Sequence, residues 1–256
     1  MKTKFLIPSS DPVLLEKANR VAKEFIQKYI NDNVVGIVFL GAIVRGYFDH
    51  LADIDIAVFK KQNSEVPLTK KFYQIEDLEV QIWLSAYESE LTIPWDMAKR
   101  WTYSQCRIYF DSQDKISHLL QEKVPLKPEE KKWLMMSGLT LSEWYINRLT
   151  QLWMERGNIV SAHHMFDQGI IYFFDMLFGL NDELVPDMKW RYYCVEQLKH
   201  LPHNFQEWIQ ETMSLHAFTM EEIERRKRAF MEMWREMQPI IEEKVQMTFE
   251  EMVQIL

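Results

Sequence analysis

Glycine is scarce in this chain, and three of its seven glycines fall within eleven residues, at Gly36, Gly41 and Gly46. The apolar segment Val34–Leu40 leads into Gly41, and a second apolar segment, 54–59, follows the cluster. Both segments have the length and composition of short buried strands. Because glycine tolerates sharp turns and close approaches that other residues exclude, the pattern predicts two strands joined through a turn that lies close to a ligand.

The second apolar segment is introduced by two aspartates, Asp53 and Asp55. Residues two apart in a strand lie about 7 Å apart and point to the same face, so the carboxylates should share one face while Ile54 and Ile56 point into the core. Two adjacent carboxylates repel each other, and a hard cation such as Mg2+ relieves that repulsion through their oxygens. The pattern indicates a metal site; the alternative is a polar edge strand with two solvated aspartates.

The segment Gly41-Ala42-x-x-x-Gly46 is followed, after six intervening residues, by Asp53-Ile54-Asp55-Ile56. This pattern resembles the signature of the polymerase-β-like nucleotidyltransferases. Within that superfamily it is similar to the small antibiotic-type (aminoglycoside and lincosamide) enzymes. The resemblance implies that Asp53 and Asp55 bind Mg2+ and, through it, a nucleoside triphosphate, expected to be ATP. It also implies transfer of the nucleotidyl group to an acceptor hydroxyl.

Alanines at Ala42 and Ala52 depart from the family pattern, which usually has serine at both positions. The first of these serines normally contacts the triphosphate, so Ala42 predicts weaker phosphate binding. A short helix should follow Gly41, and the N–H groups of such a turn form an anion site. Arg45 would add positive charge there, with a solvated surface arginine as the alternative, and Gly46 would turn the chain back toward the aspartates.

A third carboxylate, on a strand after the aspartate pair, acts in the family as a metal ligand or general base. Segments 71–75 and 78–84 predict two strands joined by a turn at Glu76 and Asp77. The apolar residues at even positions of the second strand should pack against helices, which places Glu79 on the opposite face. We therefore assign Glu79 as the third carboxylate in preference to the two turn residues.

The order of the predicted elements indicates two domains. Short strands mixed with helices up to residue 124 predict an α+β domain, with a short mixed sheet and helices on one side. After the boundary at Pro125-Leu126-Lys127-Pro128, strand patterns fade and long helical patterns dominate. We expect a nucleotidyltransferase catalytic domain over residues 1–124. Residues 125–256 should form an all-α helical bundle, which in many family members follows the catalytic domain and here would provide the substrate-binding side of the cleft.

Within the helical half, Asn181 and the segment 186–190 resemble a part of the helical domains of this family. Lys189 would lie on the opening turn of a helix, where a positive charge opposes the helix dipole. That position favours an anionic partner, for which the triphosphate is the candidate. An ordinary surface lysine is the alternative.

Composition excludes several classes of partner. The net charge of −8 argues against broad nucleic-acid binding, which depends on a basic surface, and against an anionic membrane surface. No apolar run is long enough to span a membrane, and residues 1–8 contain too few apolar residues for a signal peptide. Cys106 and Cys194 lack metal-binding spacing, so we expect free thiols in a cytoplasmic protein.

The leading functional hypothesis is Mg2+-dependent transfer of a nucleotidyl group, expected to be adenylyl, to the hydroxyl of a small antibiotic-like or sugar-like acceptor, with release of pyrophosphate. Two alternatives stay open. The acceptor can be a macromolecule, tRNA or protein, as in the toxin-like branch of the superfamily. Or Ala42 can mark a degenerate, non-catalytic nucleotide-binding module.

Overall fold

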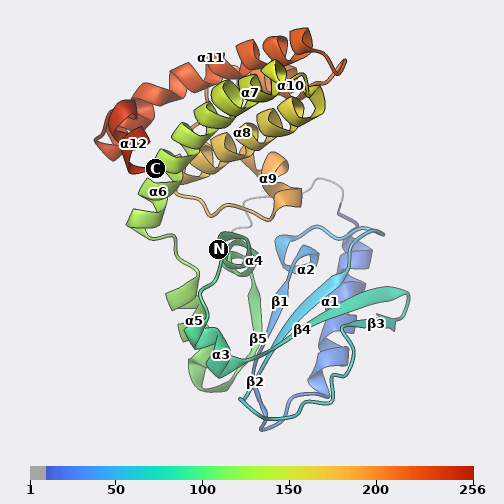
Figure 1. The fold of residues 1–256 in the computed structure, drawn as a ribbon. Helices are drawn as coiled ribbons and strands as arrows, with labels where there is room; N and C mark the ends of the chain where they lie inside the picture. The colour runs from blue at the N-terminus through green and yellow to red at the C-terminus, as the bar shows by residue number, and fades with distance from the viewer. Residues whose placement is uncertain (1–9) are drawn as a thin grey trace. The chain divides into compact units, whose positions relative to one another are not determined.

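The computed structural model describes residues 10–256; the segment of the signal-peptide prediction lies outside the described residues. The chain divides into two compact units, Met1–Pro125 and Leu126–Leu256 (Figure 1). Within the described residues, every strand belongs to the first unit. No described helix combines the length and the apolar character that crossing a membrane requires.

Helices and short strands alternate in the first unit. In chain order its elements are α1 (Pro12–Gln27), β1 (Val34–Leu40), α2 (Ala42–Arg45), β2 (Ile54–Lys60), β3 (Phe72–Ile75), β4 (Leu78–Ala86), α3 (Tyr87–Thr92), α4 (Met97–Ser104), β5 (Arg107–Asp111), the 3-10 turn η1 (Ser112–Asp114) and α5 (Lys115–Lys123). Helix α1 begins after Asp11, whose side chain accepts hydrogen bonds from the Val13 and Leu14 amides. These contacts satisfy two of the amides that a helix start leaves unpaired.

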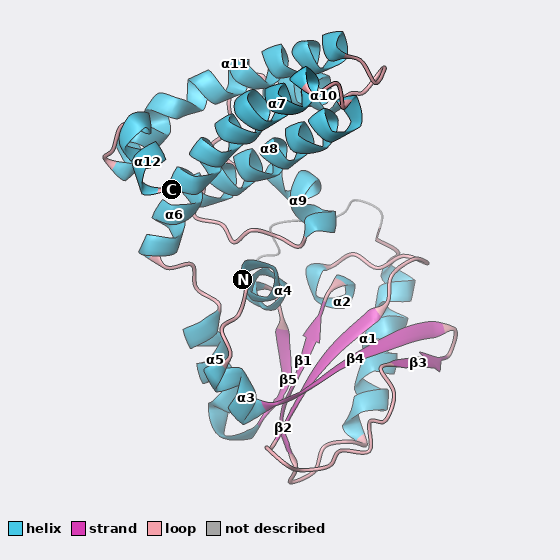
Figure 2. Cartoon of the chain, viewed as in Figure 1, coloured by secondary structure: helices cyan, strands magenta, loops and turns pink. Residues whose placement is uncertain are grey.

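The five strands form one mixed sheet in the order β3-β4-β2-β1-β5 (Figure 2). β2 runs parallel to β4, whereas β1 is antiparallel to both β2 and β5, and β3 is antiparallel to β4. β2 therefore lies at the centre of the sheet. The alternative of a polar edge strand for the aspartates is wrong, because both edges of β2 are hydrogen-bonded.

Helices cover both faces of the sheet. On one face, Ile54 and Ile56 of β2 pack with Phe25 of α1. On the other face, Phe59 of β2 packs with Tyr103 of α4. The predicted α+β class with a short mixed sheet is confirmed, and the expectation of helices on one side only is corrected. The physical reason is that β1 and β2 are central strands, so almost all of their side chains are buried on both faces.

The second unit is an all-α bundle, as predicted. Its elements are α6 (Pro128–Glu143), the π-helical segment η2 (Trp144–Leu149), α7 (Thr150–Glu155), α8 (Ile159–Leu180), α9 (Met188–Val195), α10 (Phe205–Met213), α11 (Met220–Val245) and α12 (Phe249–Ile255). Thr248 and Glu251 form a capping box at the start of α12.

A buried arginine links three helices of the bundle. Arg226 of α11 is 3% exposed; its guanidinium donates to the Thr212 carbonyl oxygen of α10 (2.7 Å) and to His163 Nδ1 of α8 (2.9 Å). It also pairs with Asp167 (2.5 Å). Burial, and then the Arg226 charge, lower the pKa of His163, so the imidazole is neutral and accepts at Nδ1.

We expect Arg226→Ala to lower the free energy of unfolding by about 3 kcal/mol. The substitution leaves the Thr212 carbonyl oxygen and His163 Nδ1 buried without the charged donor that they have in the native protein. The half-exposed Asp167 can form hydrogen bonds with water instead. Arg228→Ala is the matched control, because Arg228 lies on the same helix and is exposed, and it should change stability by no more than about 0.5 kcal/mol. Urea denaturation followed by circular dichroism measures both, and equal losses would contradict the role given to Arg226.

Candidate functional site

The glycine turn joins the end of β1 to the single helical turn α2. Gly41 adopts φ 62° and ψ −142°, and Gly46 adopts φ 79° and ψ 16°; both positive φ values favour glycine. The Val44 and Arg45 amides donate to the Gly41 carbonyl oxygen, at 3.3 and 3.1 Å. The two glycines therefore bracket one turn of helix, the short helix that the sequence predicted.

Gly41 lies against Asp55. Their strands are paired so that Leu40 is opposite Asp55, which brings the turn onto the carboxylate. A Cβ atom at Gly41 would overlap the Asp55 side chain, with the Oδ2 atom nearest. Only glycine allows the backbone of the turn and this carboxylate to meet.

The two aspartates lie at the start of the central strand. Asp53 directly precedes β2, Asp55 is its second residue, and both are half-buried. Ile54 and Ile56 are fully buried on the α1 face, so Asp55 points to the opposite face, as the alternation predicts. Its Oδ1 atom accepts a hydrogen bond from the Trp83 indole N–H at 3.2 Å.

Glu79 lies next to the aspartates in the strand register. The parallel pairing of β2 with β4 begins with Ile54 opposite Val80, so Asp53 and Glu79 occupy matching positions just before it. Glu79 is exposed between buried neighbours. The apolar face of β4 ends earlier than predicted, because Leu84 is 39% exposed.

The other two candidate carboxylates form the turn that the sequence predicted. Glu76 and Asp77 have φ values of 47° and 62° and connect β3 to β4. Both form ion pairs with α1, Glu76 with Arg20 (2.7 Å) and Asp77 with Lys17 (2.5 Å). Helix α1 covers the face opposite Asp55, so these ion pairs account for the negative charge at both positions without a bound metal.

Arg45 is buried, with 3% of its surface exposed. Its guanidinium carbon lies 3.5 Å from the Trp101 ring centroid, and Nη2 donates to the Trp101 carbonyl oxygen at 3.4 Å. The alternative of a solvated surface arginine is therefore wrong. A role of Arg45 toward phosphate stays a prediction.

Ala42 is 5% exposed and packs in the α1-side core. Its methyl group faces other apolar side chains. At position 42 only the backbone, and not the side chain, is therefore available to a ligand. A serine at this position would place its hydroxyl in the same buried surroundings.

Tyr47 belongs to the site, although we assigned it no role from the sequence. Burial raises the pKa of Tyr47 well above its ordinary value; the Arg45 charge opposes the rise, and the charges of Asp55, Asp53 and Asp49 add to it. The phenol is protonated at neutral pH and lies within electrostatic range of both site aspartates. No sequence signal identifies it, because an aromatic residue beside a glycine turn is most often a core residue.

The predicted metal ligands are Asp53, which directly precedes β2, and Asp55, which lies on it. Among the residues that the structure describes, no three His, Cys, Asp or Glu side chains gather closely enough to hold a metal. Mg2+ typically binds through one or two carboxylates together with substrate phosphates and water. Asp53 and Asp55 fit such an ion, and Glu79 as a third ligand stays a prediction.

Lys189 lies on the opening turn of α9, as predicted. It is exposed, and its backbone amide donates to the capping Asp187 side chain at 3.2 Å. Asn181 has a structural task, since its side chain bonds the Leu177 and His200 carbonyl oxygens and the Lys199 and His200 amides. A contact of Lys189 with the triphosphate stays a prediction.

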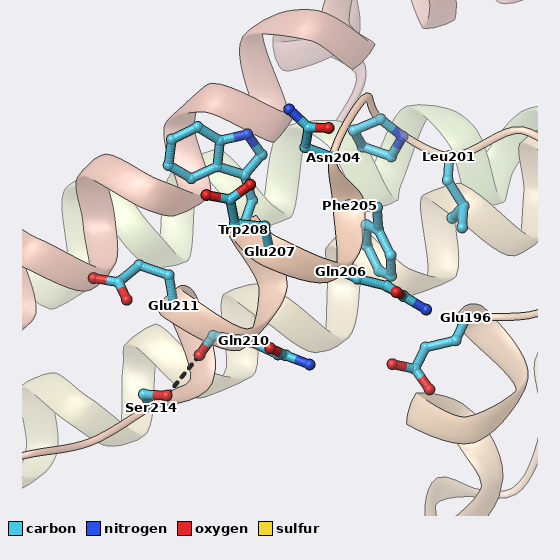
Figure 3. A pocket seen from close by; sticks show the side chains of 11 residues that line it. Glu196, Leu201, Asn204, Phe205, Gln206, Glu207, Trp208, Gln210, Glu211 and Ser214 are labelled. Atoms are coloured by element: carbon cyan, nitrogen blue, oxygen red, sulfur yellow. Dashed lines mark hydrogen bonds between the residues drawn. The ribbon is translucent and has the colours of Figure 1, made fainter.

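A surface hollow in the helical unit lies along α10 (Figure 3). Its polar lining includes Glu196, Glu207, Gln206 and Gln210. Glu211 also lines it and is ion-paired with Arg225. Because the lining residues are acidic or neutral, this hollow does not suit a triphosphate.

Comparison with known proteins yields structural likenesses but no match in sequence. No model of a known protein family matches the chain, and no curated protein matches it. Among solved structures, the chain is similar to a nucleotidyltransferase-like protein from Exiguobacterium sibiricum 255-15, at 12% identity and a TM-score of 0.48. The alignment covers 90% of this chain and 77% of that chain. The functional assignment therefore depends on the residues of the glycine turn and the aspartates.

We expect Gly41→Ala to lower stability by roughly 2–3 kcal/mol, because alanine is strained at this φ and ψ and its Cβ displaces the Asp55 carboxylate. Binding of Mg2+-ATP, measured by calorimetry, should be lost. Gly157→Ala is the matched control, since Gly157 also has a positive φ (70°) but a Cβ there meets no atom within 4 Å. The control should lose about 1 kcal/mol and change no ligand binding. Unchanged Mg2+-ATP affinity in Gly41→Ala would contradict this assignment.

Proposed function

We propose that this protein is a Mg2+-dependent nucleotidyltransferase. It transfers a nucleotidyl group, with ATP as the expected donor, to the hydroxyl of a small acceptor and releases pyrophosphate. The observation that carries the proposal is the contact between Gly41 and Asp55, where bare backbone and a carboxylate meet. The second carboxylate, Asp53, lies two residues before Asp55 in the chain. A phosphate group held by a metal needs both kinds of partner at one place.

Each side chain near the turn has a distinct task in this reaction. Asp53 and Asp55 would hold Mg2+, which when bound neutralises phosphate charge and lowers the pKa of the acceptor hydroxyl. The amides of the turn donate to phosphate oxygens. The Trp83 indole fixes the orientation of the Asp55 carboxylate through its hydrogen bond, and Glu79 accepts the proton of the acceptor hydroxyl.

One observation favours a second candidate function, nucleotide binding without transfer. Gln81 is the register partner of Asp55 on β4, so the residue beside Asp55 is a neutral amide and adds no charge to the donor set. Ala42 also lacks the hydroxyl of the usual family serine. Release of pyrophosphate from ATP in the presence of acceptor separates this candidate from the transferase.

A radioactive label on the transferred nucleotidyl group identifies the class of acceptor. The protein is incubated with ATP labelled at the α-phosphorus, Mg2+ and a cell extract, and labelled products are separated by size. A labelled small molecule supports the proposal. Label on tRNA or protein instead supports the macromolecular alternative.

Asp53→Asn and Asp55→Asn should each abolish transfer while leaving the fold intact, because each removes a charge that holds Mg2+. Glu76→Gln is the control, since Glu76 is paired with Arg20 on the opposite side of the sheet, and it should keep full activity. The measurements are pyrophosphate release and Mg2+-dependent ATP binding by calorimetry. Full activity in either aspartate variant would exclude this site.

Glu79→Gln should reduce the transfer rate by about 10²–10⁴-fold, the usual contribution of a general base, with Mg2+-ATP binding largely kept. Gln81→Glu tests the neighbouring position and should strengthen Mg2+ binding, because it adds a carboxylate beside Asp55. If Glu79→Gln is fully active and Glu76→Gln is inactive, the assignment of the third carboxylate is wrong.

A further inference from the structure

Two large aromatic side chains are exposed on the face of the sheet that carries Asp55. Phe72 is 48% exposed and Trp83 is 46% exposed. Phe72 is opposite Gln81 across β3 and β4, and Gln81 is opposite Asp55 across β4 and β2, so these side chains share a face. Trp83, two residues beyond Gln81, points the same way and contacts Asp55 through its indole N–H.

A lysine lies over these rings. Lys71 Nζ is 4.5 Å from the Trp83 ring centroid and 5.3 Å from that of Phe72. Within the described part of the chain, no carboxylate pairs with Lys71. Near the aspartates, Arg45 is already stacked on Trp101, whereas Lys71 is exposed and can reach a new anion.

Amide side chains complete this surface. Gln74 of β3 lies on the same face, opposite Glu79, and is exposed. We call the group Lys71, Phe72, Gln74, Gln81 and Trp83 the aromatic edge. It combines flat apolar surfaces, hydrogen-bonding amides and one positive charge, next to a site carboxylate.

The aromatic edge and the glycine turn lie on opposite sides of Asp55. In the sheet order, β4 and β3 are on one side of β2, and β1, which leads into the turn, is on the other (Figure 2). Phosphoryl-type transfer places the attacking and leaving oxygens roughly in line. If the turn holds the departing phosphates, the acceptor must approach from the aromatic edge.

We propose that the aromatic edge is the acceptor subsite and binds a ring compound with several hydroxyls and one anionic group, the chemistry of a sugar phosphate. This inference rests on the proposed function. The rings of Trp83 and Phe72 receive the apolar face of the sugar, Gln81 and Gln74 bond its hydroxyls, and Lys71 pairs with the anion.

The charges at the edge distinguish this ligand from others. A neutral sugar leaves Lys71 without a counterion. A cationic amino sugar would pair with Glu79 or Asp55 on the same face, and it too would leave Lys71 unpaired. An RNA needs a row of cations along its backbone, whereas the aromatic edge supplies one. A single anionic group on a small ring compound matches the edge.

The transfer step balances with this acceptor. A hydroxyl oxygen of the sugar phosphate forms a bond to the α-phosphorus of ATP, and the bond between that phosphorus and the bridging oxygen breaks. The electron pair leaves on pyrophosphate, and the hydroxyl proton passes to the Glu79 carboxylate. The product is a nucleotidylated sugar phosphate.

The Trp83 indole N–H reports directly on this subsite in the full-length, ¹⁵N-labelled protein, with its resonance assigned by Trp83→Phe. Glucose 6-phosphate is the probe, and glucose, glucosamine and inorganic phosphate are the comparisons. Glucose 6-phosphate should shift the resonance with saturation and bind at least twofold more tightly than any of the three. Lys71→Gln should weaken glucose 6-phosphate about two- to fivefold, the range of an exposed ion pair, and leave glucose unchanged.

Calorimetry with Trp83→Ala provides the second measurement, with Trp133→Ala as control because Trp133 is exposed to a similar extent (51%) in the helical unit. Loss of glucose 6-phosphate binding in Trp83→Ala alone supports the subsite. The inference is overturned by no shift with glucose 6-phosphate, by equal affinity for inorganic phosphate, or by tighter binding of a single-stranded RNA oligonucleotide.

The proposed function has its own readout in the same sample. Mg2+-ATP should shift the Trp83 resonance through Asp55, and this response should vanish in Asp55→Asn. A protein that binds glucose 6-phosphate without any response to Mg2+-ATP has the subsite but not the transferase chemistry. A protein that responds to Mg2+-ATP and not to glucose 6-phosphate retains the transferase proposal and excludes the subsite.

Discussion

The contact between the Gly41 backbone and the Asp55 carboxylate is the constraint on which the candidate site depends. A side chain at Gly41 would occupy the space of the Asp55 oxygens, so the turn can lie on the carboxylate only because that residue is glycine. The pairing of Leu40 with Asp55 fixes the approach. Because the sheet sets this geometry, the backbone of the turn and a carboxylate are placed together before any ligand arrives, which lowers the cost of ordering them on binding.

The sheet positions every other group of the site. β2 is central, so Asp55 has a neighbour on each side: the turn after β1, and Gln81 with Trp83 on β4. Ile54 and Ile56 anchor the strand from the opposite face, where they are fully buried. A shift of one residue in this register would bury the aspartates and expose the isoleucines, and the apolar core therefore protects the orientation of the carboxylates.

Several of the positively charged side chains in the first unit are engaged in contacts within the protein. Arg45 stacks on Trp101 and holds α2 in place, while Lys17 and Arg20 of α1 neutralise the β3–β4 turn on the far face. Lys71 lies over Trp83, where we propose that it pairs with an anionic group of the acceptor. Under the proposed function, the two site carboxylates favour a ligand that brings its own cation, as a Mg2+-bound triphosphate does, and the neutral Tyr47 phenol adds no charge of its own.

Local sequence patterns were enough to predict part of the structure of this protein. The alternation of residues 54–59, the turn residues Glu76 and Asp77 and the helical periodicity after residue 125 predicted the strands, the hairpin and the bundle, because these depend on neighbours in sequence. Glycine spacing predicted the turn after β1. Only the tertiary structure decided the strand order, the helices on both faces, the burial of Arg45 and the exposure of Trp83, because each depends on contacts between segments far apart in the chain, which no local pattern encodes.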